Sequence, residues 1–140
     1  MTASIEDRLA ICDLFVRYTG ALDAGDVEGI VACFTQDGSL ESPTVGSYTG
    51  HQGIRAFAER FARFRANGAQ LRHAITNLAV AVDGDRATAT CYLINYITRN
   101  GKSELLAPGR YECDIERKAG EWRFRRRVVI LDQEVRLDGI

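Results

Sequence analysis

Apolar side chains recur every three or four residues near the start of the chain and again after residue 50, a spacing that predicts amphipathic helices. Ser4 stands three residues before Asp7, which is the spacing of a helix-capping box, and Asp26 can cap a second helix. The pattern therefore predicts three helices, at Ser4–Ala24, Val27–Phe34 and His51–Arg65.

After residue 68 the apolar period changes to two, with many Val, Ile, Thr, Tyr and Cys residues, which is typical of β-strands. Four strands are predicted, at Leu71–Val82, Arg86–Thr98, Arg110–Lys118 and Glu121–Asp132. Hairpin turns are expected at Asp83-Gly84-Asp85 and Ala119-Gly120. Elsewhere we expect a turn at Gln36-Asp37-Gly38, a short strand at Ser39–Ser42 and loops at Pro43–Gly50 and Asn100–Gly109.

Helices that are segregated from strands predict an α+β fold, with the four strands in an antiparallel meander. Because one long and one medium helix must cover one face, we expect a strongly curved antiparallel sheet wrapped around three N-terminal helices. Such a sheet leaves a cavity between itself and the helices. With 140 residues, 46% of them hydrophobic, the chain is long enough for a single domain over residues 1–140 with one core.

Composition narrows the function classes. The net charge of −1 disfavours a nucleic-acid binder, and the longest apolar runs, Leu78–Val82 and Val128–Leu131, are far too short to span a membrane. We expect no signal peptide, and four separated cysteines, read as core thiols, favour a reducing cytosol. Only two histidines occur, His51 and His73, which excludes a His-rich metal site but not a carboxylate site. No metal-spacing motif appears, and we expect neither a metal nor a cofactor; His51 is interpreted as a turn or cap residue.

Asp23 and His73 are the first candidates for chemistry. Asp23 lies at the C-terminal end of the long predicted helix, where the helix dipole disfavours a carboxylate. It is either a solvated charge or a group held to orient a donor. His73 shares strand parity with Ile75 and Asn77 and can face the helices. It is either a simple hydrogen-bonded residue or, paired with Asp23, a proton-transfer group at an apolar cavity.

Tyr18 and Arg127 are further candidates. Tyr18 precedes Asp23 by five residues, so the two side chains flank a site rather than touch. The Tyr18 phenol either donates a hydrogen bond to a substrate in that site or packs at the helix edge with its hydroxyl in water. On a strand, Arg123, Arg125 and Arg127 share one face with Val129 and Leu131. If that face lines the cavity, Arg127 is the innermost charge and stabilises an anion; otherwise the arginines form surface ion pairs.

These residues together resemble the SnoaL-like branch of the nuclear-transport-factor-like superfamily. The resemblance covers nearly the whole chain and is carried by Ile11-x-Asp13-Leu14-x-x-Arg17-Tyr18, Ala21-Leu22-Asp23-x-Gly25-Asp26, Cys33-Phe34-x-x-Asp37-Gly38, Gly46-x-Tyr48-x-Gly50-x-x-Gly53-Ile54, His73-x-x-x-Asn77 and Gly120-x-Trp122-x-Phe124-x-x-Arg127. It implies a cone-shaped α+β barrel. The subset Tyr18, Asp23 and His73 is similar to the acid–base set of scytalone dehydratase, bile-acid 7α-dehydratase and hexachlorocyclohexane dehydrochlorinase.

The resemblance implies that His73 is the base and Asp23 its orienting partner, with Tyr18 and Arg127 near the leaving group. Tyr48 matches a loop residue that reaches the substrate in scytalone dehydratase. Three further residues, Leu93, Asn95 and Tyr111, have the strand parity of cavity-lining, substrate-binding positions. The resulting hypothesis is a cofactor-independent lyase, of dehydratase type, acting on a small hydrophobic cyclic or aromatic substrate.

Three rival readings stay open. In the first, the same groups catalyse an isomerisation or a cyclisation. In the second, the chain is a non-catalytic small subunit of a ring-hydroxylating dioxygenase, since such subunits share this fold. In the third, it is a binding protein that only sequesters an apolar ligand. Apolar residues occur on both predicted sheet faces, so we also expect a homo-oligomer, a trimer ahead of a dimer by the resemblance. No nucleic-acid or membrane partner is expected.

Overall fold

The computed structural model describes residues 4–135, so both ends of the domain expected over 1–140 lie outside the described residues. Its three helices are α1 (Ile5–Ala24), α2 (Val27–Ala32) and α3 (Gly50–Ala66). As predicted, Ser4 caps α1 by accepting a hydrogen bond from the Asp7 main-chain N–H, at 3.0 Å. Asp26 caps α2 in the same way. None of the helices in this part of the chain is long and apolar enough to cross a membrane.

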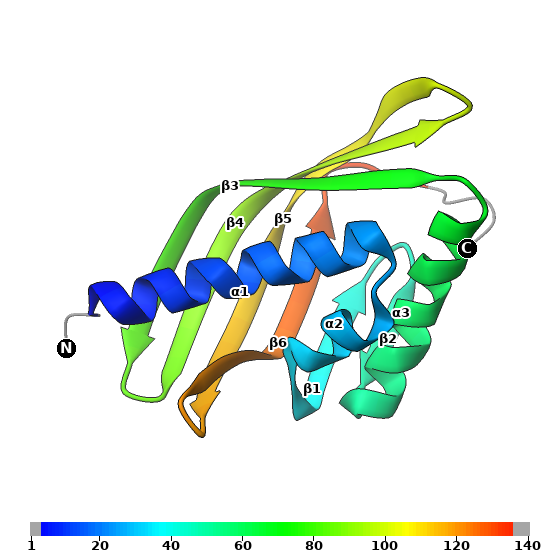
Figure 1. Cartoon of the computed structure of the whole chain (residues 1–140). Coiled ribbons are helices and arrows are strands. Elements are labelled where there is room, and N and C mark those ends of the chain that lie inside the picture. Colours follow the sequence, from blue (N-terminus) through cyan, green and yellow to red (C-terminus); the bar gives the residue numbers. More distant parts are fainter. Residues whose placement is uncertain (1–3, 136–140) are drawn as a thin grey trace.

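Six strands form one sheet in the order β2-β1-β6-β5-β4-β3. Their bounds are β1 (Phe34–Ser42), β2 (Gly46–Thr49), β3 (Gln70–Asp83), β4 (Arg86–Arg99), β5 (Lys102–Lys118) and β6 (Glu121–Leu131). The four long strands β3 to β6 form the expected antiparallel meander, whereas β1 runs parallel to β6. Because β2 and β3 lie at the two edges, the curved sheet does not close on itself (Figure 1).

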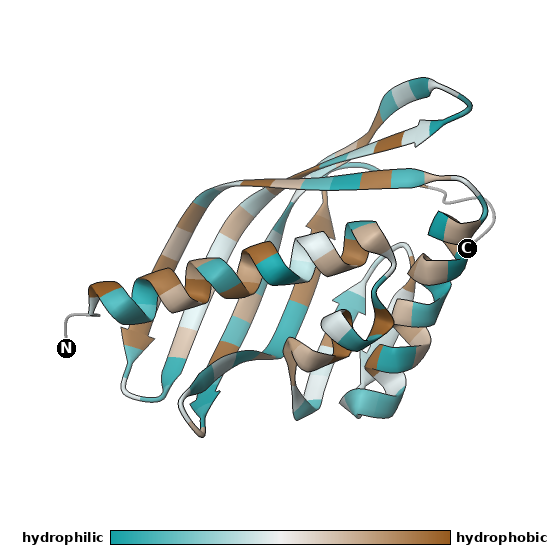
Figure 2. Cartoon of the chain, in the orientation of Figure 1, coloured by the Kyte–Doolittle hydropathy of each residue, from teal (hydrophilic) through white to brown (hydrophobic). Residues whose placement is uncertain are grey.

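Helix α1 lies across one face of the sheet, and α2 and α3 stand beside β1 and β2 (Figure 1). Brown and teal positions alternate along the strands (Figure 2), as expected for a sheet with one face on a core. The centre of that core is aromatic. Phe124 on β6 makes edge-to-face contacts with Phe15 and Tyr18 of α1, with ring centroids 5.2 and 5.5 Å apart. The α+β fold expected from the sequence is thus confirmed.

Two segments predicted as loops are strands. Residues Gly46–Thr49 form the edge strand β2, and β5 begins at Lys102 rather than at Arg110. The reason in the second case is a two-residue turn: Asn100 and Gly101 have φ angles of 52° and 75°, so Arg99 pairs directly with Lys102. Asn-Gly is a strong signal for this tight turn, and the hairpin it makes extends beyond the rest of the sheet (Figure 1).

Two shorter expectations also differ. The predicted turn at Gln36-Asp37-Gly38 lies inside β1, where the pairing with β6 shifts register between Phe34 and Ser39. Helix α2 ends at Ala32 because Phe34 already begins that strand. Three cysteines are buried, but Cys12 on α1 is only partly so, and the expectation of a core thiol is wrong there.

A β-bulge in β6 separates the arginines that were expected on one face. Asp114 of β5 pairs with Arg126 and Ile115 pairs with Phe124, which leaves Arg125 without a partner in the ladder. An extra residue exchanges the two faces of a strand. Arg127 is therefore buried like Phe124, whereas Arg125 is exposed and Arg123 half-buried. The predicted common face is wrong for Arg123 and Arg125, but Val129 and Leu131, which follow Arg127 in regular alternation, do line the cavity.

Candidate functional site

The end of helix α1 places a carboxylate at the edge of the sheet. Gly25 ends α1 in the left-handed conformation, with φ 70°, and its N–H bonds back to the Ala21 and Leu22 carbonyls. A side chain at this glycine would meet Ala62 of α3, because an added Cβ would lie 3.2 Å from the Ala62 Cα. The tight ending therefore sets α1 against α3 and leaves Asp23 in the last turn, facing β3.

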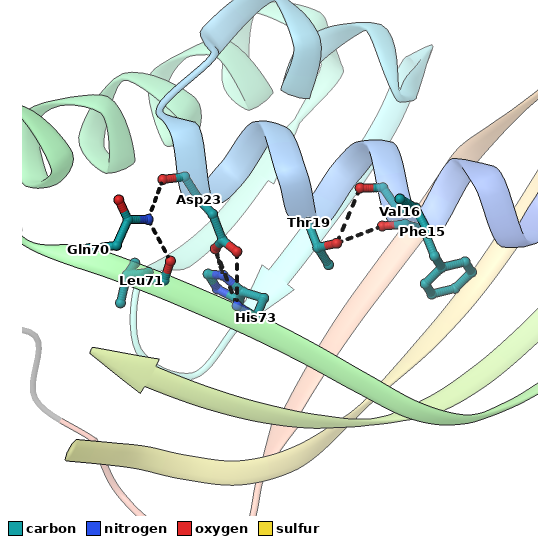
Figure 3. A network of polar contacts seen from close by, with 7 residues as sticks. All are labelled: Phe15, Val16, Thr19, Asp23, Gln70, Leu71 and His73. Atoms are coloured by element: carbon teal, nitrogen blue, oxygen red, sulfur yellow. Dashed lines mark hydrogen bonds and ion pairs between the residues drawn. The ribbon is translucent and has the colours of Figure 1, made fainter. Parts of the chain in front are cut away.

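The structure brings Asp23 and His73 into direct contact (Figure 3). The His73 Nδ1 lies 2.5 Å from one carboxylate oxygen of Asp23, and the His73 main-chain N–H donates to the same carboxylate at 3.1 and 3.3 Å. The side chain of His73 is 4% exposed and that of Asp23 is 13% exposed, so the pair is shielded from bulk water. A carboxylate at Nδ1 selects the tautomer with the proton there, which leaves Nε2 as the basic nitrogen.

Two neighbours hold this pair in place. The Gln70 side-chain amide donates to the main-chain carbonyl of Asp23 at 3.0 Å and to that of Leu71 at 2.8 Å, which ties the end of α1 to the start of β3 (Figure 3). Phe61 of α3 packs on the other side, with its ring centroid 6.2 Å from that of the imidazole. The imidazole is thus oriented by contacts from α1, α3 and β3.

His73 borders a cavity between the helices and the sheet. The cavity has a volume of about 530 Å³, part of which is open to solvent. Four of the residues predicted for the site line it together with His73, namely Tyr18, Leu93, Asn95 and Tyr111. Asp23 lies behind His73 and does not line it.

Asn95 and His73 are direct cross-strand partners on β4 and β3. Side chains of such a pair stand next to each other on the same face of a sheet. The Asn95 Oδ1 is buried and has no hydrogen-bond partner in the described part of the chain. The cavity therefore offers an unused acceptor beside the imidazole.

Other lining residues were not proposed as site residues from the sequence. The apolar side of α3 contributes Phe57 and Phe61, which its periodicity marks only as core. The turn between β1 and β2 contributes Thr44 and Val45, and the segment after β6 contributes Val135. No local pattern marks these last positions, because they lie outside the helices and strands and reach the cavity only in the folded chain.

Tyr48, predicted to bind substrate, is not among the lining residues. Its hydroxyl donates to the Val45 carbonyl at 2.8 Å and accepts from Arg60 at 2.7 Å, while Arg60 also donates to that carbonyl at 3.0 Å. In this structure Tyr48 holds the turn that carries Val45 against the cavity.

Arg127 lies behind the cavity wall. Its side chain has no exposed surface, and it does not line the cavity. The guanidinium carbon lies 3.6 Å from the ring centroid of Tyr111 and 4.1 Å from that of Tyr18. Its Nη1 donates to the Cys113 Sγ at 3.3 Å. The guanidinium therefore does not line the cavity itself but contacts the rings of two tyrosines that do.

Burial changes the acidity of these tyrosines. It raises the pKa of Tyr111 to about 12, although the nearby Arg127 charge and a hydrogen bond from it lower this value. Burial likewise raises the pKa of Tyr18 well above its ordinary value, against the lowering effect of Arg127. Both phenols are therefore protonated at neutral pH and are available as hydrogen-bond donors.

Within residues 4–135, no group of three or more His, Cys, Asp or Glu side chains is placed to hold a metal ion. The chemistry that this site offers on its own is proton transfer at His73, with phenol and amide groups to bind oxygen atoms. These groups surround an otherwise apolar hollow, the arrangement common to small-molecule sites.

Known proteins share both the sequence and this architecture. The chain is 29% identical over 128 residues to an uncharacterised protein of Mycobacterium tuberculosis, covering 90% of this chain and 86% of that one. A second M. tuberculosis protein, of unknown function, superposes with a TM-score of 0.82 at 28% identity, over 93% of this chain and 74% of that one. An NTF2-like protein with a cystatin-like fold from Novosphingobium aromaticivorans superposes with a TM-score of 0.81 at 27% identity, over 93% and 85%.

The SnoaL-like domain family matches residues 3–128, which is nearly all of the sequence. The match includes the helix that carries Tyr18 and Asp23 and the strands that carry His73 and Arg127. The chain belongs to the SnoaL-like family.

Proposed function

We propose that this protein is a cofactor-independent lyase of dehydratase type, acting on a small hydrophobic cyclic or aromatic substrate. The observation that carries the proposal is the Asp23–His73 contact at the wall of an apolar cavity. A shielded carboxylate–imidazole pair is the arrangement that moves a proton at neutral pH. A protein that only assembles or only stores a ligand has no need of one.

In the proposed reaction His73 Nε2 removes a proton from a carbon beside a carbonyl group. The electron pair of that C–H bond forms the new C=C bond as the C–O bond to the neighbouring hydroxyl breaks. The imidazolium then returns its proton to the departing hydroxide, and water leaves. Asp23 stays ionised throughout and holds Nδ1–H.

The lining polar groups have separate tasks in this scheme. The Tyr18 and Tyr111 hydroxyls donate to the carbonyl oxygen, on which negative charge develops as the proton leaves. The unpartnered Asn95 Oδ1 accepts a hydrogen bond from the substrate hydroxyl beside His73.

Isomerisation of a double bond and closure of a ring begin with the same proton removal. They differ only in where the resulting electron pair goes, which the substrate decides. We therefore place the committed step at His73 for each of these reactions and treat elimination as the leading case.

The test follows carbon-bound hydrogen directly. Cyclic ketones with a β-hydroxyl group are incubated with the protein in D₂O, and deuterium uptake and loss of water are read by mass spectrometry. His73→Ala is expected to lower both rates by about 10²–10⁴-fold, the range for general base catalysis. The control is His51→Gln, which alters the other histidine; the ring of His51 bonds to the Phe34 carbonyl away from the cavity. This variant should leave the rates of deuterium uptake and water loss unchanged. Full turnover by a correctly folded His73→Ala protein would refute the mechanism.

A further inference from the structure

Arg127 is a buried cation without a carboxylate partner among the described residues. Its Nε and Nη2 have no hydrogen-bond partner there, and its Nη1 donates to the Cys113 thiol. Four aromatic rings surround the guanidinium, with centroids between 3.6 and 5.2 Å from its central carbon. Burying an unpaired charge is costly, so its retention calls for a reason beyond packing.

The position of the charge suggests that reason. Two of the four rings, those of Tyr18 and Tyr111, form part of the cavity wall, and they are the two closest to the guanidinium. The other two, Phe15 and Phe124, belong to the core. Of the four rings around Arg127, only the two that carry hydroxyl groups line the cavity.

We propose that Arg127 is a positioning residue that makes the Tyr18 and Tyr111 hydroxyls an anion-binding site, and that the ligand carries an ionisable oxygen on a planar ring, bound as the phenolate or enolate. This inference rests on the proposed function, in which those hydroxyls receive the developing negative charge. It differs from a role in which the arginine itself touches the leaving group.

The physical basis is the electrostatics of a low-dielectric interior. A cation on the face of a phenol ring draws electron density from the ring and strengthens the O–H as a donor. With no carboxylate against the guanidinium, its field is not cancelled and extends through the rings into the cavity. The lowering effect of Arg127 on the pKa of both phenols agrees with this direction.

The experiment needs no turnover, so it separates this inference from the proposed reaction. The probe is 4-nitrophenol, whose ionised form absorbs visible light and whose neutral form does not. The wild-type protein is titrated with the probe at several pH values around neutrality. We expect the bound probe to be mainly the phenolate at a pH where the free probe is mainly neutral.

Three variants test the source of that preference. Arg127→Met removes the charge and keeps the volume, and we expect the phenolate affinity to fall at least ten-fold, with the residual bound probe neutral. Arg127→Lys keeps the charge and should retain most of the preference. The matched control is Arg125→Met, two residues earlier and exposed on the bulge, which should bind like the wild type.

If Arg127→Met does not fold, the double variant Tyr18→Phe/Tyr111→Phe replaces it, since it leaves the arginine and removes only the hydroxyls. It should lose the phenolate preference as well. The inference is overturned if the wild type binds no probe or binds the neutral form, if Arg127→Lys loses as much as Arg127→Met, or if the Phe variant keeps the preference. Phenolate binding together with a fully active His73→Ala protein would uphold the anion site and reject only the reaction.

Discussion

The carboxylate of Asp23 accepts hydrogen bonds from both the ring Nδ1 and the main-chain N–H of His73, a residue 50 positions later in the chain. The main-chain bond holds the carboxylate to the backbone of β3 independently of the ring. The imidazole therefore has a partner whose position does not depend on its own protonation. This also explains how a carboxylate is tolerated at the negative end of the α1 dipole.

The first prediction concerns Asp23→Asn. An asparagine keeps an oxygen for the main-chain N–H but no longer favours a proton on Nδ1, so part of the imidazole population loses a basic Nε2. Deuterium exchange catalysed by the protein should fall about 10²–10⁴-fold, the usual worth of positioned acid–base groups. Thermal unfolding should change far less than the rate. An exchange rate equal to that of the wild type would show that the carboxylate has no part in proton transfer.

The second prediction is a loss of stability in alkali. Burial raises the pKa of Cys113 from 9.0 to about 11 and that of Tyr111 from 10.0 to about 12. Between the unfolded and the folded pKa values, the unfolded chain releases a proton that the native chain retains, so stability falls as pH rises. Each group contributes about 1.4 kcal/mol per pH unit over its window. Urea unfolding at pH 8 to 11 should show a midpoint that declines from about pH 9.

Tyr111→Phe provides the control for this prediction. It removes one titrating group from the upper part of the window, so its stability should fall less steeply above pH 10 than that of the wild type. A stability that stays constant to pH 11 in both proteins would contradict the burial of these groups.

The third prediction concerns the end of α1. Gly25→Ala forces a side chain into the left-handed region and toward Ala62, and we expect a loss of about 1–2 kcal/mol in the free energy of unfolding from the backbone conformation alone. Gly20→Ala is the contrasting variant, because this glycine lies within the same helix with open space around it. It should raise stability by up to about 1 kcal/mol. Equal effects of the two substitutions would contradict the cap.

The fourth prediction concerns self-association. The outer face of the sheet exposes Tyr92 by 56% and Tyr96 by 44%, together with Leu105. We expect a homo-oligomer held through this face, a trimer ahead of a dimer. Sedimentation at micromolar concentration should give a mass above that of one chain, and Tyr92→Lys with Tyr96→Lys should lower it.

The control for this prediction is Leu9→Lys, because Leu9 is 59% exposed but lies on α1, away from the sheet face. It should leave the mass unchanged. A wild-type protein that sediments as a monomer would reject the interface altogether.

Much of the fold follows from local patterns. The three helices begin and end close to their predicted bounds because capping residues and apolar periodicity act within a few positions of the chain. The strands of the meander are also predicted from a local pattern, the alternation of apolar and polar residues. The parity of β4, and of β5 beyond its irregularity at Leu106, also placed Leu93, Asn95 and Tyr111 on the cavity side, since a stretch of strand without a bulge alternates strictly.

Where local patterns were insufficient, the deciding contacts are distant in sequence. The bulge at Arg125 arises from the pairing of β6 with β5, and it alone separates Arg125 from the buried Arg127. β2 exists because β1 lies beside it, and Tyr48 turns to Val45 and Arg60 rather than to the cavity. A single sequence carries no direct signal for such pairings.

By itself, then, the amino-acid order determined the helices, the meander and the residue types from which an acid–base pair could be made. Only the tertiary structure decided that Asp23 meets His73, that Arg127 lies behind two tyrosines and that Tyr48 faces away. The physical reason is that hydrogen-bond and π contacts act over a few ångströms of space, whereas periodicity reports only on neighbours along the chain.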